Sequence, residues 1–496
     1  MSHSTSRLQQ CLLFCITGVA AVLFYLWRSL QVYSMGFPLD DAWIHQTYAR
    51  NLAISGQWFF QAGAPSTGST APLWTCLLVP GYLIKVSPEI WSAVLGTLLL
   101  ISTAWMAFRW LELRMEPAPA LVIISGLVVL LDWHLLWAAV SGMETLAACF
   151  LVIAFFYLLE GSPQKPFLLG TVIGLGVWIR PDLITLLLPL AAATLLKWKD
   201  GIRSLIAYLF SVAAGLCVFV VPYLWVNKVL SDAWWPSTFY AKQAEYAVLR
   251  TLPLGRRILR QFSQPLIGAG GILLPGILIN VGYTLRRKKW YYLAPHLWVL
   301  AYLTLFAAQL PVTYQHGRYA MPVVAVVLSL GMSGFLSAIR WNANQFFLRI
   351  ASRVWAVSGI LVLLVFVLKG SQVFAQDVAI IESEMVVTAN WITKNTAKDD
   401  LIAAHDIGAI GYFSERKLLD LAGLISPEVI PILRSEPDLA VYMDENEVDY
   451  LVTFPEWYPD LTASAELVFH TDTDYSVDAG GENMAVYRWD SAAFAP

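Results

Sequence analysis

Two adjacent carboxylates stand where a long apolar run ends. Asp40 and Asp41 follow a Pro-Leu pair and precede an aromatic segment that ends in His45. A carboxylate that is partly removed from water has a raised pKa and suits general-base work, and a pair of carboxylates suits Mg²⁺ or Mn²⁺. His45, four residues after Asp41, would share a helical face with it and could support either role. The structural alternative is that Asp41 only caps a helix over 41–53 while Asp40 faces solvent.

Further polar segments lie at predicted ends of apolar runs, at 141–145, 180–182, 235–242 and 316–319. Each one alone has a structural explanation, because an Arg at a membrane end often only reaches toward water. Together they bring three cations and another carboxylate to the face of the two aspartates. These residues are Arg180, Lys242, Arg318 and Glu144. Arg suits phosphate because its planar guanidinium can contact two oxygens, so the set fits a reaction in which a phosphate leaves and a hydroxyl attacks.

The composition indicates which elements must carry these side chains. The chain has 496 residues, of which 58% are apolar and only 14% charged, and its mean hydropathy is +0.60. A soluble domain has about 25% charged residues. Residues 1–370 hold 26 Lys and Arg against 12 Asp and Glu, whereas residues 371–496 hold 6 against 23. We therefore exclude a soluble cytosolic enzyme and a nucleic-acid-binding protein, and we predict a membrane domain over 1–370 followed by an acidic domain over 371–496.

The apolar runs predict a polytopic helical membrane protein, since about 20 apolar residues cross the hydrocarbon core. Nine runs lie near 9–31, 90–110, 119–138, 143–160, 203–228, 264–285, 290–310, 318–338 and 353–370, and 166–198 holds two shorter passes. The resulting count is about eleven transmembrane helices. The short run 72–85 is predicted to be a juxtamembrane helix, because that choice places basic loops such as 286–289 together in the cytoplasm. The N-terminus is then cytoplasmic and the C-terminal domain extracytoplasmic, at the plasma membrane.

Three extracytoplasmic pieces follow from this topology: the loop 32–71 with the two aspartates, the loop 229–263, and the tail. The basic half of 229–263 departs from the positive-inside rule. It indicates either an interfacial helix against anionic lipid, or a cytoplasmic loop and a topology that differs by one reversal. The tail has a helical pattern over 377–395 and five strand-like runs at 401–404, 418–421, 450–454, 466–469 and 484–489. This alternation predicts a small α/β domain. The five cysteines all lie in apolar stretches and indicate no disulfide or zinc site.

The polar segments resemble, in order, those of polyprenyl-phosphate-dependent glycosyltransferases of the GT-C fold. The similar segments are Pro-Leu-Asp-Asp-Ala-Trp-Ile and Tyr-Ala-Arg-Asn-Leu-Ala within 38–53, Ala-Pro-Leu-Trp at 71–74, Ser-Gly-Met-Glu-Thr at 141–145, Arg-Pro-Asp at 180–182, Ser-Thr-Phe-Tyr-Ala-Lys at 237–242 and Arg-Tyr-Ala-Met-Pro at 318–322. The branch that they resemble most includes the mycobacterial cell-wall arabinofuranosyltransferases. The stretches at 406–414 and 420–424 also look like the exported domain of such proteins.

The resemblance implies inverting transfer of a hexosyl or pentosyl group from a polyprenyl-phosphate donor to a glycan or lipid acceptor at the outer face of the membrane. Asp40 and Asp41 carry over as the catalytic or metal-binding carboxylates. A Mg²⁺ or Mn²⁺ at this pair is the one cofactor that they would suit, and the reaction does not require it. The donor-phosphate contacts that it implies are Arg180, Lys242, Arg318 and Tyr319. The supporting residues are His45, Glu144, Tyr240 and His316.

Two alternative functions share these residues. A protein-directed mannosyltransferase-like GT-C enzyme would differ only in its acceptor. A transporter of lipid-linked glycans would place ionisable residues in mid-membrane and would often have repeated halves. Transfer is favoured because the charges gather at one face and no repeat is evident. The expected partners are the lipid-linked donor, a glycan, lipid or protein acceptor and membrane lipids, without nucleic acid.

Overall fold

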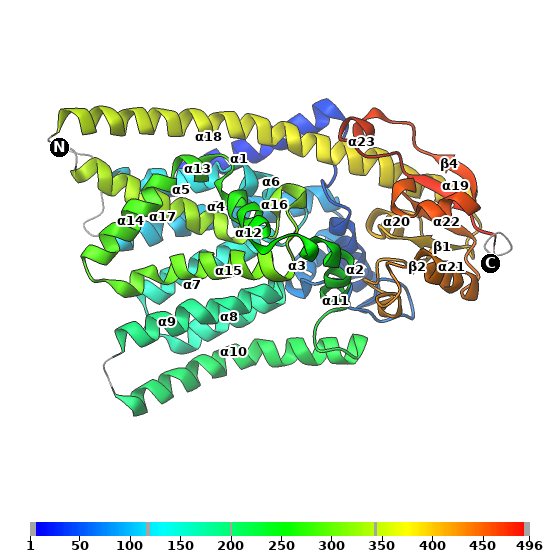
Figure 1. Cartoon of the computed structure of the whole chain (residues 1–496), viewed down its shortest axis with the longest axis horizontal. Helices are drawn as coiled ribbons and strands as arrows, with labels where there is room; N and C mark the ends of the chain where they lie inside the picture. The colour runs from blue at the N-terminus through cyan, green and yellow to red at the C-terminus, as the bar shows by residue number, and fades with distance from the viewer. Residues whose placement is uncertain (1–5, 116–119, 199–200, 342–344, 491–496) are drawn as a thin grey trace.

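The apolar runs form helices that lie side by side along the length of the molecule. The computed structural model describes residues 6–115, 120–198, 201–341 and 345–490 (Figure 1). A helical bundle fills one end of the molecule, and a small domain with a five-stranded sheet lies at the other. This is the predicted architecture of a polytopic helical protein with a C-terminal α/β domain.

Six helical segments of the described chain are long and apolar enough to cross a membrane. They are α1 (Arg7–Val32), α4 (Pro88–Arg114), α10 (Ile202–Ser231), η5 with α15 (Trp290–Gln309), α17 (Met321–Trp341) and α18 (Phe346–Ile381). Shorter apolar helices lie among them, namely α3 (Pro72–Leu83), α7 (Thr145–Gly161), α8 (Pro166–Ile179), η2 (Pro181–Leu186) and α9 (Leu187–Lys197). The chain is therefore an integral membrane protein. Its orientation and the count of about eleven crossings stay predictions.

Two of the predicted continuous runs are interrupted. The run 119–138 is divided into α5 (Ile123–Leu130) and α6 (Trp133–Ala139), because Asp132 has extended backbone and its side chain accepts the amide N–H that starts α6. The run 264–285 begins with η4 (Gln264–Leu266) and continues as α13 (Ala269–Ile272) and α14 (Leu274–Arg286). Gly268, with φ +97°, separates η4 from α13 in a conformation that side chains rarely adopt.

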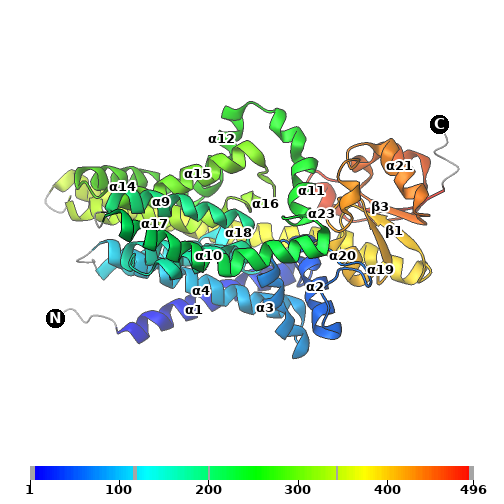
Figure 2. The ribbon, with the colours of Figure 1, turned by 90° about the horizontal axis from the view of Figure 1, so that it is seen from below.

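Close packing of α8 against α10 fixes the helix that ends next to Arg180. A Cβ atom added at Gly170 would lie 2.0 Å from the carbonyl oxygen of Val212, and one added at Gly215 would lie 2.1 Å from that of Phe167. Only glycine permits the two backbones to approach so closely. In Figure 2, α10 runs across the face of the bundle that is turned toward the viewer, and in Figure 1 it lies along one side.

The C-terminal sheet has the strand order β2-β1-β3-β5-β4. The strands are β1 (Leu401–Ala404), β2 (Lys417–Asp420), β3 (Tyr450–Thr453), β4 (Glu466–His470) and β5 (Ala485–Arg488), each within two residues of a predicted strand at either end. Strand β1 is parallel to both β2 and β3, whereas β5 is antiparallel to β3 and β4. The carboxyl ends of β1, β2 and β3 therefore share one edge of the sheet. Helix α20 (Gly408–Phe413) begins at this edge, shortly after β1.

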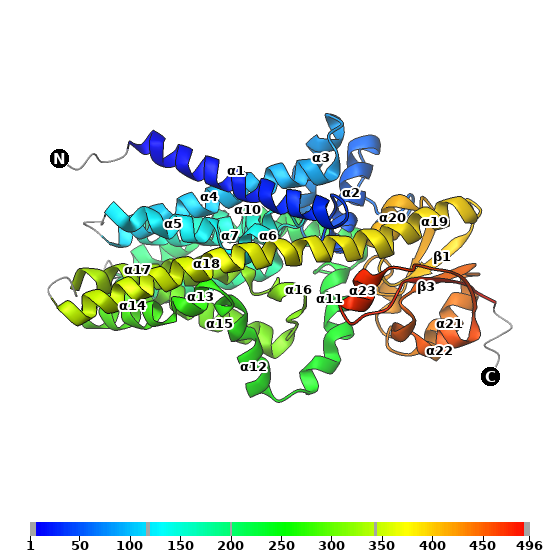
Figure 3. The same cartoon turned by 90° about the horizontal axis from the view of Figure 1, so that it is seen from above.

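One helix joins the two ends of the molecule. α18 crosses the predicted domain boundary at 370 without a break and continues through a π-helical turn (Glu382–Val386) into α19 (Val387–Asn395) (Figure 3). The turn places the buried carboxylate of Glu384 against the sheet domain, where it accepts hydrogen bonds from Thr471, Thr473 and Asn483 side chains and from the Met484 N–H. The sheet domain is thus attached to the bundle through this helix as well as through the first loop.

Candidate active site

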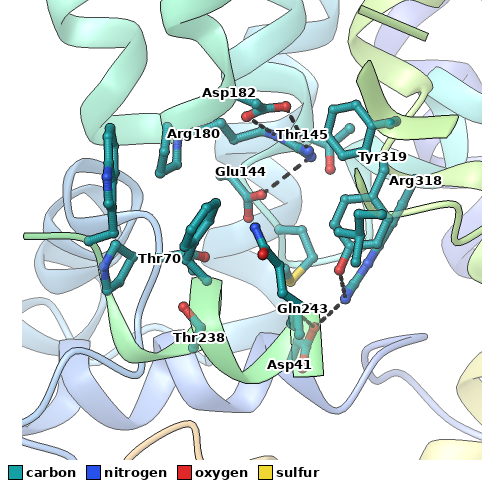
Figure 4. A pocket seen from close by; sticks show the side chains of 18 of the residues that line it. Asp41, Thr70, Glu144, Thr145, Arg180, Asp182, Thr238, Gln243, Arg318 and Tyr319 are labelled. Carbon is teal, nitrogen blue, oxygen red and sulfur yellow. Dashed lines mark hydrogen bonds and ion pairs between the residues drawn. The ribbon is translucent and has the colours of Figure 1, made fainter. Parts of the chain in front are cut away.

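A cavity of about 520 Å³ lies where the bundle meets the sheet domain. Seven of the predicted site residues line it, namely Asp41, His45, Glu144, Arg180, Lys242, Arg318 and Tyr319. They come from α2 (Asp41–Ser55), the start of α7, the α8–η2 junction, α11 (Ser237–Glu245) and the segment before α17. Three other predicted residues, Asp40, Tyr240 and His316, are not among the lining residues. Figure 4 shows Asp41 on one side of the cavity and Glu144 with Arg180 on the other.

Asp41 does not cap α2, as the structural alternative required, but is its first residue and turns its carboxylate to two cations. The Oδ2 atom accepts hydrogen bonds from Lys242 Nζ, at 3.2 Å, and from Arg318 Nη2. Burial by itself raises the pKa of Asp41, but the positive charges of Lys242 and Arg318 outweigh it and hold the pKa well below its usual range. Asp41 is therefore ionised at neutral pH when the cavity contains no other anion.

The loop that carries Asp41 also positions the helix of Lys242. Thr67 Oγ1 accepts a hydrogen bond from the Ser237 N–H at 2.9 Å, at the first turn of α11. Lys242 follows one and a half turns later, on the side that faces the cavity. The 32–71 and 229–263 loops, distant in sequence, therefore meet at this hydrogen bond.

The opposite wall holds a second set of charges. Arg180 donates from Nε to Asp182 Oδ1 at 3.2 Å and from Nη2 to Asp182 Oδ2 at 3.1 Å. Its Nη1 lies 3.7 Å from Glu144 Oε1. Tyr302 from α15 donates to the same Asp182 carboxylate, which fixes the Arg180 guanidinium from behind. Asp182 and Tyr302 are missing from the predicted site; the Arg-Pro-Asp triplet contains the signal for Asp182, whereas nothing local marks Tyr302.

Tyr319 lies among the three cations. The centroid of its ring is 5.1 Å from Arg318 Cζ, 5.6 Å from Arg180 Cζ and 5.9 Å from Lys242 Nζ. An aromatic face attracts cations through its quadrupole, so the ring helps hold positive charge on one surface. This arrangement gathers three cationic groups around a single point of the cavity.

Two charged side chains that line the cavity each have a buried atom with no hydrogen-bond partner within the described residues, namely Arg318 Nη1 and Glu144 Oε2. Both side chains are 8% exposed. A buried donor or acceptor without a partner is costly, so such atoms commonly bind a ligand or water. Here they offer one donor and one acceptor to a molecule in the cavity.

His45 supports the wall around Glu144. Its Nε2 lies 3.7 Å from Glu144 Oε2, and its Nδ1 is within hydrogen-bond distance of Ser69 Oγ, at 3.0 Å, and of Thr75 Oγ1, at 3.2 Å. Burial lowers the pKa of His45 and outweighs the nearby carboxylates, so the imidazole is neutral at pH 7. A neutral ring can accept a proton at one nitrogen and release one from the other, which leaves no net charge on the imidazole.

Asp40 belongs to the junction of the bundle with the sheet domain. Its Oδ2 and Oδ1 accept the Gly408 and Ala409 N–H groups, each at 2.7 Å, at the start of α20. Burial, with the nearby Asp406 carboxylate, raises the pKa of Asp40 to about 8, although the two N–H groups oppose this. Asp40, which the structural alternative placed in solvent, is thus buried and joins two parts of the chain that are 368 residues apart.

The aspartate pair does not fit a divalent cation. Both oxygens of Asp40 are directed at backbone N–H groups, and the carboxylate of Asp41 is paired with two cations that would repel Mg²⁺ or Mn²⁺. No group of three or more His, Cys, Asp or Glu side chains with metal-binding geometry occurs in the described residues. We assign no step to a metal.

His316 lies behind Arg318 rather than in the cavity. It pairs with Asp377 of α18, Nε2 to Oδ2 at 2.7 Å, and its ring packs edge-on to Trp133 and Trp137. Gln315, His316 and Gly317 have φ angles of +53°, +58° and +66°. This left-handed conformation costs a non-glycine residue about 1–2 kcal/mol. The His316–Asp377 pair therefore holds a strained turn that directs Arg318 into the cavity.

We predict that His316→Ala raises the Km for a lipid-phosphate donor about tenfold, because the turn relaxes and Arg318 loses its fixed position. His316→Asn should restore part of the donor affinity, since Asn tolerates the left-handed region better than Ala. Steady-state kinetics with varied donor measure the effect. Equal Km values for His316→Ala and the wild type would contradict this role.

Tyr240 is 38% exposed on α11 and packs against Phe239, so its supporting role stays a prediction. Helix α12 (Leu254–Ser263) carries Arg256 and Arg260 on its exposed side and also exposes Leu254 and Leu259. This is the composition of an interfacial helix, as expected for the 229–263 loop.

The comparisons with known proteins agree with this architecture. Residues 376–487 match a domain of unknown function (DUF8728), and no curated protein matches the chain. The crystal structure of ArnT from Cupriavidus metallidurans bound to undecaprenyl phosphate is similar over 97% of this chain and 98% of that one, with a TM-score of 0.59 at 14% identity. The apo structure of the same protein gives 0.60 at 14% identity, with the same coverage of both chains.

A third structure is that of the mycobacterial arabinofuranosyltransferase AftD. It aligns at 12% identity with a TM-score of 0.40, over 96% of this chain and 41% of that one. The two ArnT comparisons extend over nearly the whole length of both chains, so they include the bundle, the first loop and the C-terminal domain. The chain therefore has the GT-C fold of ArnT.

Proposed function

We propose that this protein is a glycosyltransferase that moves a sugar from a polyprenyl-phosphate donor to a hydroxyl group of a glycan or lipid acceptor at the outer face of the membrane. The observation that supports it best is one cavity in which Asp41 faces Lys242 and Arg318 while Arg318 Nη1 keeps a donor without a partner. Such a transfer needs a carboxylate that accepts the proton of the attacking hydroxyl and cations that stabilise the departing phosphate.

The donor phosphate would bind Arg318 and Lys242, with Arg180 close to the same Tyr319 ring. The cavity continues along an apolar wall with Ile184, Leu305 and Phe239. Leu305 and Phe239 are partly exposed on the outside of the bundle, which suits the exit of a polyprenyl chain toward lipid. ArnT, which has the same fold, has been crystallised with undecaprenyl phosphate.

In the transfer step, the acceptor oxygen attacks the anomeric carbon from the side opposite the phosphate. Its proton passes to Asp41, and the bond between the anomeric carbon and the phosphate oxygen breaks with its electron pair on the phosphate. Arg318 and Lys242 then stabilise the charge that develops on the departing polyprenyl phosphate. The configuration at the anomeric carbon is inverted.

Donor binding would also prepare the base. Lys242 and Arg318 hold Asp41 in a weakly basic form, but a phosphate that shares these cations reduces their effect and adds a negative charge nearby. Asp41 would therefore accept a proton readily only after the donor is in place. This order limits deprotonation of the acceptor to the ternary complex.

The face of the membrane follows from the charge of the loops. The basic segment 286–289 lies at the end of α14, which in Figure 1 is away from the sheet domain. Basic loops favour the cytoplasm, so the cavity and the sheet domain would lie outside. Labelling of a single cysteine at position 287 from the cell exterior would contradict this orientation.

Arg318→Ala tests the proposal. Loss of a charge-assisted contact of about 1.5–3 kcal/mol should raise the Km for a polyprenyl-phosphate sugar ten- to a hundredfold in detergent. The matched control is Arg256→Ala, which removes an exposed guanidinium from α12 and should leave the Km unchanged. Product analysis with glycan, lipid and peptide acceptors identifies the acceptor class. Movement of the donor across the membrane without transfer of its sugar would instead indicate a transporter.

A further inference from the structure

The carboxyl edge of the C-terminal sheet faces the first loop. The chain passes from β1 to β2 on one side of β1 and returns to β3 on the other. Ligands of open α/β sheets bind outside the carboxyl ends of the strands at such a reversal of strand order. His405 and Asp406 follow β1 here, and Trp457 and Tyr458 follow β3. The Asp40 contacts to Gly408 and Ala409 hold this edge next to Asp41.

The side chains at this edge have the composition of a sugar-binding surface. His405 Nδ1 is 2.7 Å from the Tyr458 hydroxyl, and His405 Nε2 is 3.8 Å from Glu245 Oε1 of α11. Trp457 packs edge-on to His405, with 4.9 Å between ring centroids, and remains 47% exposed. A large aromatic side chain that keeps a face open beside fixed polar groups is suited to an amphipathic ring such as a pyranose or furanose.

Other groups at the edge have structural roles. The Asp420 carboxylate is buried and accepts the N–H groups of Ala422, Ile425 and Ser426, so it closes the loop after β2. Asp406 differs, since no hydrogen bond to its carboxylate occurs within the described residues, and it is only partly buried. Asp406 therefore retains acceptor oxygens for hydroxyl groups.

The edge adjoins the cavity through α11. Lys242 and Gln243 line the cavity, and Glu245 lies one turn after Lys242 on the same helix. Leu424, from the loop after β2, lines the cavity as well. A molecule bound between Trp457 and Glu245 would thus lie beside Asp41 and outside the donor-phosphate cations.

We propose that His405, Trp457, Tyr458 and Glu245 form the acceptor subsite, and that its ligand is a carbohydrate. Trp457 provides the stacking surface. The Glu245 and Asp406 carboxylates accept hydrogen bonds from sugar hydroxyls, and the His405–Tyr458 pair accepts or donates them. This inference rests on the proposed transfer reaction, for which it specifies the class of acceptor. It gives the acidic C-terminal domain a direct part in choosing the substrate.

The test is glycan binding by the full-length protein in detergent on an array of defined hexose and pentose oligosaccharides. We expect wild type to retain a subset, Trp457→Ala to bind it at least tenfold more weakly, and Glu245→Gln to bind it more weakly as well. Trp290→Ala is the matched control, because Trp290 is similarly exposed, at 48%, but lies in η5, at the start of α15. No binding by wild type, or equal binding by Trp457→Ala, would overturn the subsite.

The two proposals fail in different ways. Asp41→Asn should keep the array binding, since Asp41 is outside the subsite, and should lose transfer. If transfer depends on Asp41 but is unaffected by Trp457→Ala, the transferase proposal stands and the subsite proposal fails. If glycan binding depends on Trp457 but the protein transfers no sugar from any polyprenyl-phosphate donor, the transferase proposal fails.

Discussion

Replacement of Asp41 by Asn is expected to lower kcat about a thousandfold, because in the proposed reaction Asp41 accepts the proton of the acceptor hydroxyl. The fold should be retained, since Asn is the same size and can still accept hydrogen bonds from Lys242 and Arg318. Donor binding should be as tight as in wild type or tighter, because both cations are released from a carboxylate. Turnover with saturating donor and acceptor, and separate donor-binding measurements, give the two values.

This separation distinguishes a proton acceptor from a residue that only holds the cations. If Asp41 merely positioned Lys242 and Arg318, the variant would lose donor affinity and keep kcat at saturation. Retention of kcat within a factor of three would therefore remove Asp41 from the chemical step. Glu144, across the cavity with a carboxylate oxygen that lacks a hydrogen-bond partner, would then be the next residue to test.

Asp40→Ala should act on the fold rather than on the chemistry. Two buried N–H groups, those of Gly408 and Ala409, lose their acceptor, and each costs about 1–3 kcal/mol when unsatisfied. We expect a clearly lower thermal unfolding temperature and faster proteolysis between the bundle and the sheet domain. Asp472→Ala, at an exposed position of the sheet domain, is the control and should behave as wild type. Unchanged stability of Asp40→Ala would show that the contact is unimportant.

The contact of Asp40 also predicts a pH dependence. Burial and Asp406 raise the pKa of Asp40 to about 8 in the folded protein, above about 4 for an unfolded aspartate. The folded state then binds the proton more tightly, so this contribution is complete below about pH 4 and is lost as the pH rises through about 8. The stability difference between wild type and Asp40→Asn should therefore change between pH 5 and pH 8.5 in favour of wild type at the lower pH.

Much of the fold could be predicted from local patterns. The five strands of the tail are short, mostly apolar runs of four to six positions that are bounded by turn residues, so length and composition define them without tertiary information. The interruptions within 119–138 and 264–285 depend instead on one Asp and one Gly, whose effect is smaller than the apolar signal around them. The sequence did not predict that α18 continues through residue 370, because the charge composition changes at this point whereas the helix does not end there.

The site was predictable as a set of residue types but not as a geometry. The charged side chains around the cavity follow from the charges at membrane ends, yet the sequence treats Asp40 and Asp41 as equivalent. They separate only because Gly408 and Ala409, far along the chain, supply two N–H groups to one of them. Asp377 and Tyr302 could not be found for the same reason, since each acts on a residue in another helix.

The separation of 368 residues between Asp40 and Gly408 has a consequence for biosynthesis. Chains grow at about 5–20 residues per second, so roughly 20–70 seconds pass between synthesis of the first loop and arrival of its partner. During that interval the helices can enter the membrane, but the loop with Asp41 lacks the contact that orients it. Under the proposed function, an incomplete chain would therefore be unable to transfer sugar, and activity would begin only after the last quarter of the polypeptide has folded against the first loop.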